Sequence, residues 1–346
     1  MTAGVRVSVI VPCRNEREYI ERCLECILDG DFPGDALEIL VVDGRSDDGT
    51  RSIVWRYAAQ FPTVRLLDNP LRVVPAALNI GIRAARGDIV ARMDAHTLYP
   101  PYYLSRLVRA LETSGADNVG GRIVTLPAAR TAVARGIALA LGHPLGVGNA
   151  YFRIGTPRRR WVDTVPFGCY RRELFDRVGL FDEELIRNQD DEFNQRLVRH
   201  GGRILLLPDV VSYYYARATL PQLARTYYQY GLYKPLAARK GGGIRTLRQL
   251  APITFLAAVV GLGIGGLAWP PAAVLWRLVT GCYLAAVAWC SVGTARRLGA
   301  RTMLALGTAF AVLHFSYAVG WLRGLWRLLP TRTLRREDPT LVPLSR

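Results

Sequence analysis

Three long apolar segments in the last third of the chain constrain its fold more than any other feature. Residues 250–269 carry no charged residue, residues 273–292 carry only Arg277, and residues 303–322 carry none. Each segment has about 20 residues, the length that an α-helix needs to cross the hydrocarbon core of a bilayer. Tryptophan and arginine residues flank the segments, as is typical of helices that end at a membrane surface. We therefore expect three candidate transmembrane helices here rather than the core helices of a soluble protein.

The rest of the chain shows no comparable apolar segment, and its first residues, MTAGVRVSVIVPCRNE, lack the pattern of a signal peptide. We expect a soluble domain over residues 1–240, a basic hinge over 241–249, the membrane region over 250–322 and a basic tail over 323–346. Lysine and arginine before the first apolar segment place the soluble domain in the cytoplasm by the positive-inside rule. The basic tail draws the C-terminus to the same side, so two and three crossings of the cytoplasmic membrane both remain open.

The charge of the chain is strongly basic. Its 45 Lys and Arg residues against 28 Asp and Glu give a net charge of +17. Such an excess suits a nucleic acid or a membrane with anionic lipids. The basic residues crowd beside the apolar segments, as in RRLGAR and RLLPTRTLRR, and the sequence contains no recognisable nucleic-acid-binding module. We therefore expect a membrane as a partner and no nucleic acid.

Before residue 241, buried strand patterns alternate with helical patterns. The strand segments are VRVSVIVP, LEILVVD, TVRLLDN and DIVARMD. This alternation predicts an α/β fold with a mostly parallel sheet flanked by helices. Ligands of such sheets bind beyond the carboxyl ends of the strands. The polar clusters PCRNE, DGRSDDGT and DAH follow the first, second and fourth strands, so we expect these loops to converge on one crevice.

The fourth strand ends in two side chains that can bind a metal ion, Asp94 and His96. In an extended segment, residues i and i+2 point the same way, so both can face the crevice. A carboxylate oxygen and an imidazole nitrogen are suitable ligands for Mn²⁺ or Mg²⁺, and a divalent cation would allow an acidic crevice to hold a diphosphate. The two residues alone leave open an Asp that caps a turn beside a surface His. A GxGxxG dinucleotide loop and a Walker loop are both absent.

The arrangement resembles the family 2 glycosyltransferases of the GT-A fold over roughly residues 7–235. VSVIVPCRNE matches the opening strand and P-x-x-N-E loop of the family, and EILVVDGRSDDGT matches its V-D-D-G-S-x-D-G-T segment. ALNIGIRAARGDIVARMDAH matches the N-x-G…G-D…D-x-D block. Gly44 stands where a second Asp is usual, and His96 stands where the last Asp of D-x-D is usual. Within the family the chain looks like the succinoglycan-biosynthesis type, which attach a sugar to a lipid-linked oligosaccharide.

The resemblance implies roles for individual residues. Asp43 takes the position that contacts the uracil of a UDP-sugar, and Asp94 and His96 take that of the metal ligands for Mn²⁺ or Mg²⁺. The implied donor-binding residues are Pro12, Arg14, Asn15, Glu16, Asp43, Asn79, Arg92 and Asp94. In the family the corresponding region carries a small residue beside the acceptor, here Gly168 or Cys169. Arg171, with Arg172, is a further candidate for acceptor binding that would face an acceptor diphosphate, and the alternative for this pair is a solvated helix start.

A second acidic cluster, LFDEELIRNQDDEFNQRL, fits the E-D-x-D-L-x-x-R block of the family. Aligning the block on Arg196 places Asp190 at the catalytic position, and a shift of one residue would place Asp191 there. Inverting transfer needs a carboxylate that takes the proton of the acceptor hydroxyl. The alternative is a solvated helix start, where acids are favoured by the helix dipole.

The sequence thus predicts a metal-dependent, inverting transfer of one sugar from a nucleotide-sugar donor to a lipid-linked acceptor, in exopolysaccharide or cell-envelope glycan synthesis. Processive synthases of this family carry Q-x-x-R-W, and QYGLY lacks the Arg and Trp. Transfer of a single sugar is therefore favoured over polymerisation. The alternatives are a processive synthase, a nucleotidyltransferase, and an inactive membrane scaffold of the same fold.

Overall fold

The computed structural model describes residues 5–243 and 249–328. The chain divides into two compact units, the first made of residues 1–124 and 151–215 and the second of residues 125–150 and 216–346. This division differs from a boundary at residue 240, because residues 125–150 and 216–240 group with the C-terminal helices. Most of the expected basic hinge and basic tail lies outside the described residues.

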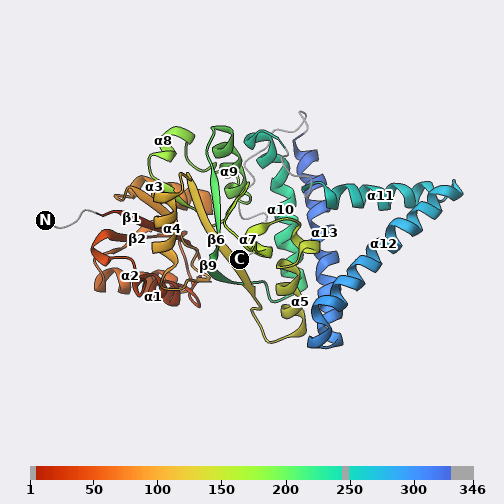
Figure 1. Cartoon of the computed structure of the whole chain (residues 1–346), viewed down its shortest axis with the longest axis horizontal. Coiled ribbons are helices and arrows are strands. Elements are labelled where there is room, and N and C mark those ends of the chain that lie inside the picture. The colour runs from red at the N-terminus through yellow and green to blue at the C-terminus, as the bar shows by residue number, and fades with distance from the viewer. Residues whose placement is uncertain (1–4, 244–248, 329–346) are drawn as a thin grey trace. The chain divides into compact units, whose positions relative to one another are not determined.

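The first unit is built on a mixed nine-stranded sheet (Figure 1). Four of its strands run parallel, as expected: β1 (Val7–Cys13), β2 (Leu37–Asp43), β3 (Val64–Asp68) and β4 (Ile89–Arg92). Beyond β4 the sheet order continues with β8 (Cys169–Arg171), β6 (Asn118–Leu126), β9 (Ile204–Tyr215) and β5 (Thr97–Leu98), and β7 (Arg160–Trp161) pairs with β9. β8 is antiparallel to both β4 and β6, and β5 and β7 are antiparallel to β9.

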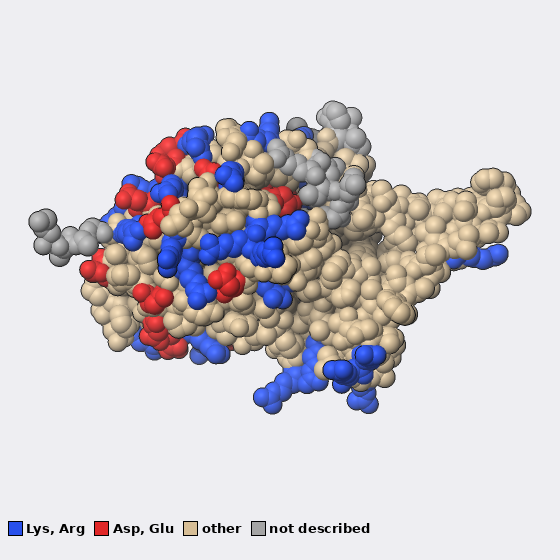
Figure 2. Space-filling model, in the orientation of Figure 1, with Lys and Arg blue, Asp and Glu red and all other residues tan. Residues whose placement is uncertain are grey.

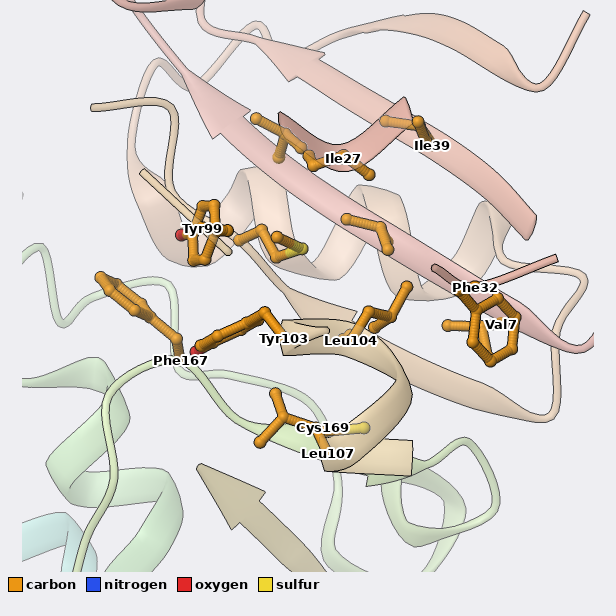
Figure 3. Packing of buried hydrophobic residues seen from close by; sticks show 14 of the residues in the cluster. Val7, Ile27, Phe32, Ile39, Tyr99, Tyr103, Leu104, Leu107, Phe167 and Cys169 are labelled. Carbon is orange, nitrogen blue, oxygen red and sulfur yellow. The ribbon is translucent and has the colours of Figure 1, made fainter. Parts of the chain in front are cut away.

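Helices cover both faces of this sheet because successive residues of its central strands point to opposite sides. All seven residues of β1 are buried, with Val9 and Val11 in one core cluster and Ile10 in the other. The first cluster, part of which is drawn in Figure 3, includes residues of α1 (Ile20–Leu28), α2 (Thr50–Gln60) and α4 (Tyr103–Thr113). The second includes residues of α3 (Val74–Ala84), α8 (Leu174–Val178) and α9 (Gln189–Arg199). The short helices η1 (Gly34–Ala36) and α7 (Tyr151–Ile154) complete this unit.

The second unit is helical. Its elements are α5 (Ala132–Leu141), α6 (Pro144–Val147), α10 (Leu220–Gly241), α11 (Ala251–Gly265), α12 (Pro270–Ala295), η3 (Arg296–Leu298) and α13 (Ala300–Arg327). Two segments, Pro270–Leu298 and Ala300–Arg327, are long and apolar enough to cross a membrane. The face of α11 and α12 seen in Figure 2 is almost free of charged side chains. Exposed apolar residues such as Ile264 and Trp289 are what a lipid-facing surface requires.

The first of the three expected spans forms a shorter helix than predicted. α11 has 15 residues, which corresponds to about 22 Å at 1.5 Å per residue, whereas a bilayer core is about 30 Å thick. The helix ends in the glycine-rich run GLGIGG, and glycine is a weak helix former. The two longer apolar helices meet the length requirement, and α11 does not.

Glycines allow α10 and α13 to pack with their backbones in close approach. A Cβ atom on Gly231 of α10 would lie 2.1 Å from the carbonyl oxygen of Tyr317, and one on Gly320 of α13 would lie 2.1 Å from that of Tyr228. Gly324, four residues after Gly320, has its own contact with α10. Small residues spaced by four are typical of closely packed helices in membranes. This contact explains why α10 belongs to the second unit.

Candidate functional site

The loops that follow β1 and β2 interlock at the carboxyl ends of these strands. The backbone N–H of Asn15 donates to Ser46 Oγ over 2.8 Å, and Asn15 Oδ1 accepts from the N–H of Asp47 over 3.0 Å. Asn15 and Arg45 both adopt left-handed backbone conformations, each with φ of 56°. Pro12 lies in β1 beside Val42, where it is buried. The structure thus joins the first two predicted loops through hydrogen bonds.

Asp43, the last residue of β2, is buried beneath these two loops rather than exposed to a ligand. Its side chain has no exposed surface, and its two oxygens accept from the hydroxyl and the N–H of Ser46 over 2.5 and 3.1 Å and from Arg51 Nη1 over 3.1 Å. The expected contact between Asp43 and a uracil therefore has no surface here. The carboxylate instead holds its own loop in shape.

The departure at Gly44 has a local explanation in the neighbouring loop. A Cβ on Gly44 would lie 3.2 Å from Cβ of Arg14 and 3.3 Å from its Cδ. The exposed Arg14 side chain therefore lies along the backbone where the family usually carries an Asp. A basic side chain, that of Arg14, therefore lies beside the position at which the family usually carries an acidic one.

One buried arginine connects the end of β4 to the start of α9. Arg92 donates to Asp94 through Nε over 2.7 Å and Nη2 over 3.0 Å, and to Asp190 through Nη1 over 2.5 Å. Burial lowers the pKa of Arg92, but the two carboxylates raise it further than burial lowers it. One cation between two anions leaves the cluster with a net negative charge. The structure therefore unites the D-x-H strand end and the second acidic cluster in one site.

Asp190 is the acidic residue of α9 that faces this site. Burial raises the pKa of Asp190 to about 6, and the nearby Asp94 and Asp191 raise it as well, whereas Arg92 opposes them. The Asp190 side chain keeps 20% of its surface exposed. Asp191 differs because its Oδ2 accepts from Nε2 of Gln195, one turn along the same helix.

His96 lies against the first loop. Its Nδ1 is 3.1 Å from Oε1 of Glu16, and its ring meets that of Tyr214 edge-on at 5.3 Å. Among residues 5–243 and 249–328, no group of three or more His, Cys, Asp or Glu side chains is arranged to hold a metal ion. Asp94 and His96 together offer one oxygen and one nitrogen ligand, a donor pair that fits Mn²⁺ if phosphate and water complete the coordination.

The structure corrects two of the three predicted acceptor-binding residues. Cys169 is fully buried in the first core cluster, where burial raises the pKa of its thiol to about 12 (Figure 3). Arg171 pairs with Ile89 at the start of β4, so it lies at the opposite end of that strand from Asp94. Of the three, only Gly168 adjoins the site, since its carbonyl accepts from the N–H of Arg92 over 3.0 Å.

Asn79 has a positioning role that the sequence did not indicate. Its Nδ2 donates to the Phe181 carbonyl over 2.9 Å and to Glu183 Oε1 over 2.8 Å, and its Oδ1 accepts from the Phe181 N–H over 3.0 Å. Asn79 is buried in α3, so these bonds tie that helix to the segment before α9. In this structure Asn79 supports the segment that leads into the acidic helix, and its role in donor binding stays a prediction.

Two further residues of α9 connect the helix to neighbouring segments. Buried Asn194 donates to Thr164 Oγ1 over 2.8 Å and to the Val165 carbonyl over 2.9 Å. Arg196 donates to the Leu180 carbonyl over 2.7 Å and to Glu192 Oε1 over 2.8 Å. Sequence reasoning used Arg196 only as an alignment marker and missed Asn194. The signal available for Asn194 was its position one helical turn after Asp190.

Comparison with known proteins identifies relatives over most of the chain. The model of the family described as Glycosyl transferase family 2 matches residues 8–179. The chain is 32% identical to the succinoglycan biosynthesis protein ExoA of Rhizobium meliloti (strain 1021), over 93% of this chain and 94% of the relative. It is 28% identical to a dolichyl N-acetyl-alpha-D-glucosaminyl phosphate 3-beta-D-2,3-diacetamido-2,3-dideoxy-beta-D-glucuronosyltransferase of Methanococcus voltae, over 75% of this chain and 82% of the relative.

Among solved structures, the chain is similar to the mannosyltransferase PcManGT from Pyrobaculum calidifontis in complex with GDP-Man and Mn²⁺. The TM-score is 0.61 at 25% identity, over 94% of this chain and 89% of the other.

Proposed function

Because the chain belongs to glycosyl transferase family 2, we propose that it transfers one sugar, with inversion, from a nucleotide-sugar donor to a lipid-linked acceptor. Two relatives, the succinoglycan biosynthesis protein ExoA and the transferase named for a dolichyl-linked sugar, support a lipid-linked or polysaccharide product. The acceptor hydroxyl attacks the anomeric carbon on the face opposite the nucleoside diphosphate, which leaves with the bonding electron pair. The product therefore has the opposite anomeric configuration.

The observation that carries this proposal is the connection of Asp94 and Asp190 through Arg92. It places the carboxylate of α9 beside the end of β4, where the family binds its donor. Asp190 acts as the general base that takes the proton of the acceptor hydroxyl. Its raised pKa, about 6, makes it a stronger base than an ordinary Asp while it remains ionised at neutral pH. Asp191, which bonds within its own helix, is the less suitable candidate.

A divalent cation fits beside this base. Asp94 and His96 would hold Mn²⁺ or Mg²⁺, and the Mn²⁺ in the PcManGT complex supports this assignment. When bound, the cation would neutralise negative charge on the leaving diphosphate. Arg92 holds Asp94 through both carboxylate oxygens, and each oxygen retains a second lone pair for a further ligand.

The nucleobase of the proposed donor is either uracil or guanine. The family resemblance favours a UDP-sugar, whereas PcManGT was solved with GDP-Man. Asp43, the expected uracil contact, is buried, and Arg14 over Gly44 is exposed at the same edge. We assign base contact to Arg14 and the backbone of the loop after β2. A test must therefore include both uridine and guanosine nucleotides.

The second unit supports a membrane-bound acceptor. Two of its helices are long and apolar enough to cross a bilayer, which suits a multi-pass protein of the cytoplasmic membrane. In this arrangement the first unit lies in the cytoplasm, where sugar nucleotides are made, and the lipid acceptor comes from the inner leaflet.

The decisive experiment is product analysis with the full-length chain in nanodiscs. Radiolabelled UDP- and GDP-sugars are incubated with extracted lipid acceptors and Mn²⁺, and lipid products are separated by chain length and anomeric configuration. The proposal expects one added sugar of inverted configuration, lost in Asp190→Asn. A retained configuration or a polymer ladder would contradict it, and donor binding without any transfer would favour the inactive scaffold.

A further inference from the structure

We propose that Glu16 is a positioning residue that selects the nitrogen with which His96 binds the cation of the donor diphosphate. The inference rests on the proposed function, because it presumes that Asp94 and His96 face a cation. It concerns a pairing that requires the His of D-x-H, which this chain carries in place of the usual D-x-D. The pairing joins two separate motifs, the P-x-x-N-E loop and the end of β4.

The contact between the two side chains determines the tautomer of His96. Nδ1 of His96 lies 3.1 Å from Oε1 of Glu16, and the two side chains keep only 26% and 14% of their surface exposed. A carboxylate oxygen accepts, so Nδ1 must carry the hydrogen and Nε2 keeps its lone pair. Metal-binding histidines commonly use one nitrogen for the metal and donate the other N–H to a carboxylate. Nε2 is therefore the nitrogen available to a cation.

Glu16 is held by its backbone at the start of α1. Its N–H donates to Thr50 Oγ1 over 2.8 Å, and its carbonyl accepts from the N–H groups of Tyr19 and Ile20 over 2.9 and 2.8 Å. The left-handed Asn15 precedes it and is bonded to the loop after β2. The carboxylate thus projects from a fixed backbone, so it can fix the orientation of the imidazole.

The aromatic ring of Tyr214 restrains the imidazole as well. The two rings meet at 64° with their centroids 5.3 Å apart. The Glu16 bond and this edge contact together leave His96 little freedom to rotate. A ligand that is already oriented loses less conformational entropy when the cation binds.

The same geometry predicts the opposite effect when the usual Asp is restored at position 96. A carboxylate there would face the Glu16 carboxylate, and two like charges at this separation repel. Glu16 should therefore strengthen cation binding when residue 96 is His and fail to strengthen it when residue 96 is Asp. A purely structural role for Glu16 would act the same way in both backgrounds.

The test measures Mn²⁺ affinity directly, by electron paramagnetic resonance of free Mn²⁺ titrated into the detergent-solubilised full chain with UDP or GDP. Loss of a carboxylate that orients a metal-bound His costs roughly 10–100-fold in affinity. We expect Glu16→Ala to weaken Mn²⁺ binding by about 10-fold, and Glu16→Gln, which keeps an acceptor oxygen, to weaken it less. Glu21→Ala on the exposed face of α1 is the matched control and should match the wild type.

The His96→Asp background distinguishes a positioning role of Glu16 from a purely structural one. There, Glu16→Ala should leave Mn²⁺ binding unchanged or tighten it. Equal weakening in both backgrounds, or no weakening with His96, would overturn the inference while leaving the proposed function intact. If the wild type binds nucleoside diphosphate equally with and without Mn²⁺, the cation in the proposed function fails and this inference fails with it. Glu16→Gln preserves the shape of the side chain, so it provides the comparison, with a smaller weakening expected in the His96 background, if Glu16→Ala does not fold.

Discussion

Arg92 Nη1 lies 2.5 Å from Oδ1 of Asp190, although the two residues are 98 positions apart in the chain. Arg92 closes β4, Asp190 lies in the first turn of α9, and Asp94 accepts from the other two nitrogens of the guanidinium, Nε and Nη2. The carboxyl end of β4 and the proposed base are therefore parts of one charge network. We expect the three residues to differ in their roles, with Asp94 acting on donor binding, Asp190 on turnover, and Arg92 on the pKa of Asp190 and on stability.

Removal of the proposed base should abolish turnover and spare donor binding. Asp190→Asn keeps the shape of the side chain but cannot take a proton, so we expect kcat to fall by roughly 10²–10⁴-fold. Asp191→Asn is the matched control and should cost much less, because Asp191 bonds to Gln195. Steady-state kinetics and calorimetric binding of the nucleoside diphosphate measure the two effects. A large loss in Asp191→Asn with little in Asp190→Asn would shift the assignment by one residue.

The pH dependence of kcat/KM should reveal the same carboxyl group. The base works only when ionised, so activity should rise with pH through about 6, the raised pKa of Asp190, and level off above it. Arg92 holds this pKa down, so Arg92→Gln should move the acidic limb to higher pH. A profile measured with buffers of constant ionic strength checks both statements. An acidic limb that stays in place in Arg92→Gln would disprove the coupling.

Arg92 should also matter to stability more than exposed arginines do. Its removal leaves Asp94 and Asp190 close together without a counter-charge, and breaking a buried pair typically costs about 3–5 kcal/mol. The exposed pair of Arg56 with Glu21 is the control, because surface pairs contribute about 0–1 kcal/mol. Thermal unfolding of Arg92→Ala and Arg56→Ala in the same detergent compares them. Equal melting temperatures for the two variants would refute the network as a stabilising element.

Chelation should affect donor binding through Asp94. We expect excess chelator to weaken binding of UDP or GDP to the wild type and to have little further effect on Asp94→Ala, which has already lost a proposed ligand. The measurement is calorimetric titration with and without chelator, followed by addition of Mn²⁺. A wild-type affinity that is indifferent to chelator, or Asp94→Ala that keeps full activity, would contradict the metal site.

The contact between α10 and α13 should tolerate no side chain at its glycines. A Cβ on Gly320 would lie 2.1 Å from the Tyr228 carbonyl, so Gly320→Ala must separate the helices. Gly281→Ala in α12 is the control, since nothing lies within 4 Å of an added Cβ there. We expect a lower melting temperature for Gly320→Ala, and a slightly higher or unchanged one for Gly281→Ala, because alanine favours a helix. Equal behaviour of both variants would argue against this packing.

Local patterns in the sequence were sufficient for much of the architecture. The β-branched runs of β1 and β2 predicted buried parallel strands, because strand formation and burial depend on residues that are neighbours in sequence. The loops after β1 and β2 and the strand end at Asp94 were identified because polar residues follow each strand. The apolar character of α12 and α13 was equally evident, because a bilayer requires about 20 uncharged residues in succession.

Only the tertiary structure decided which of these residues meet. Arg171 lies far from the site because β8 runs antiparallel to β4, and strand direction depends on pairing between distant segments. Asp43 looked like a ligand contact, but Ser46 and Arg51 enclose it. The absence of a long apolar segment before residue 241 assigned residues 220–240 to the soluble domain, whereas Gly231 of α10 packs closely against α13. The sequence by itself thus determined the helices and strands and the kinds of side chain at their ends. Which of these side chains meet was decided by contacts between distant segments, because such contacts depend on chain folding and leave no local pattern in the sequence.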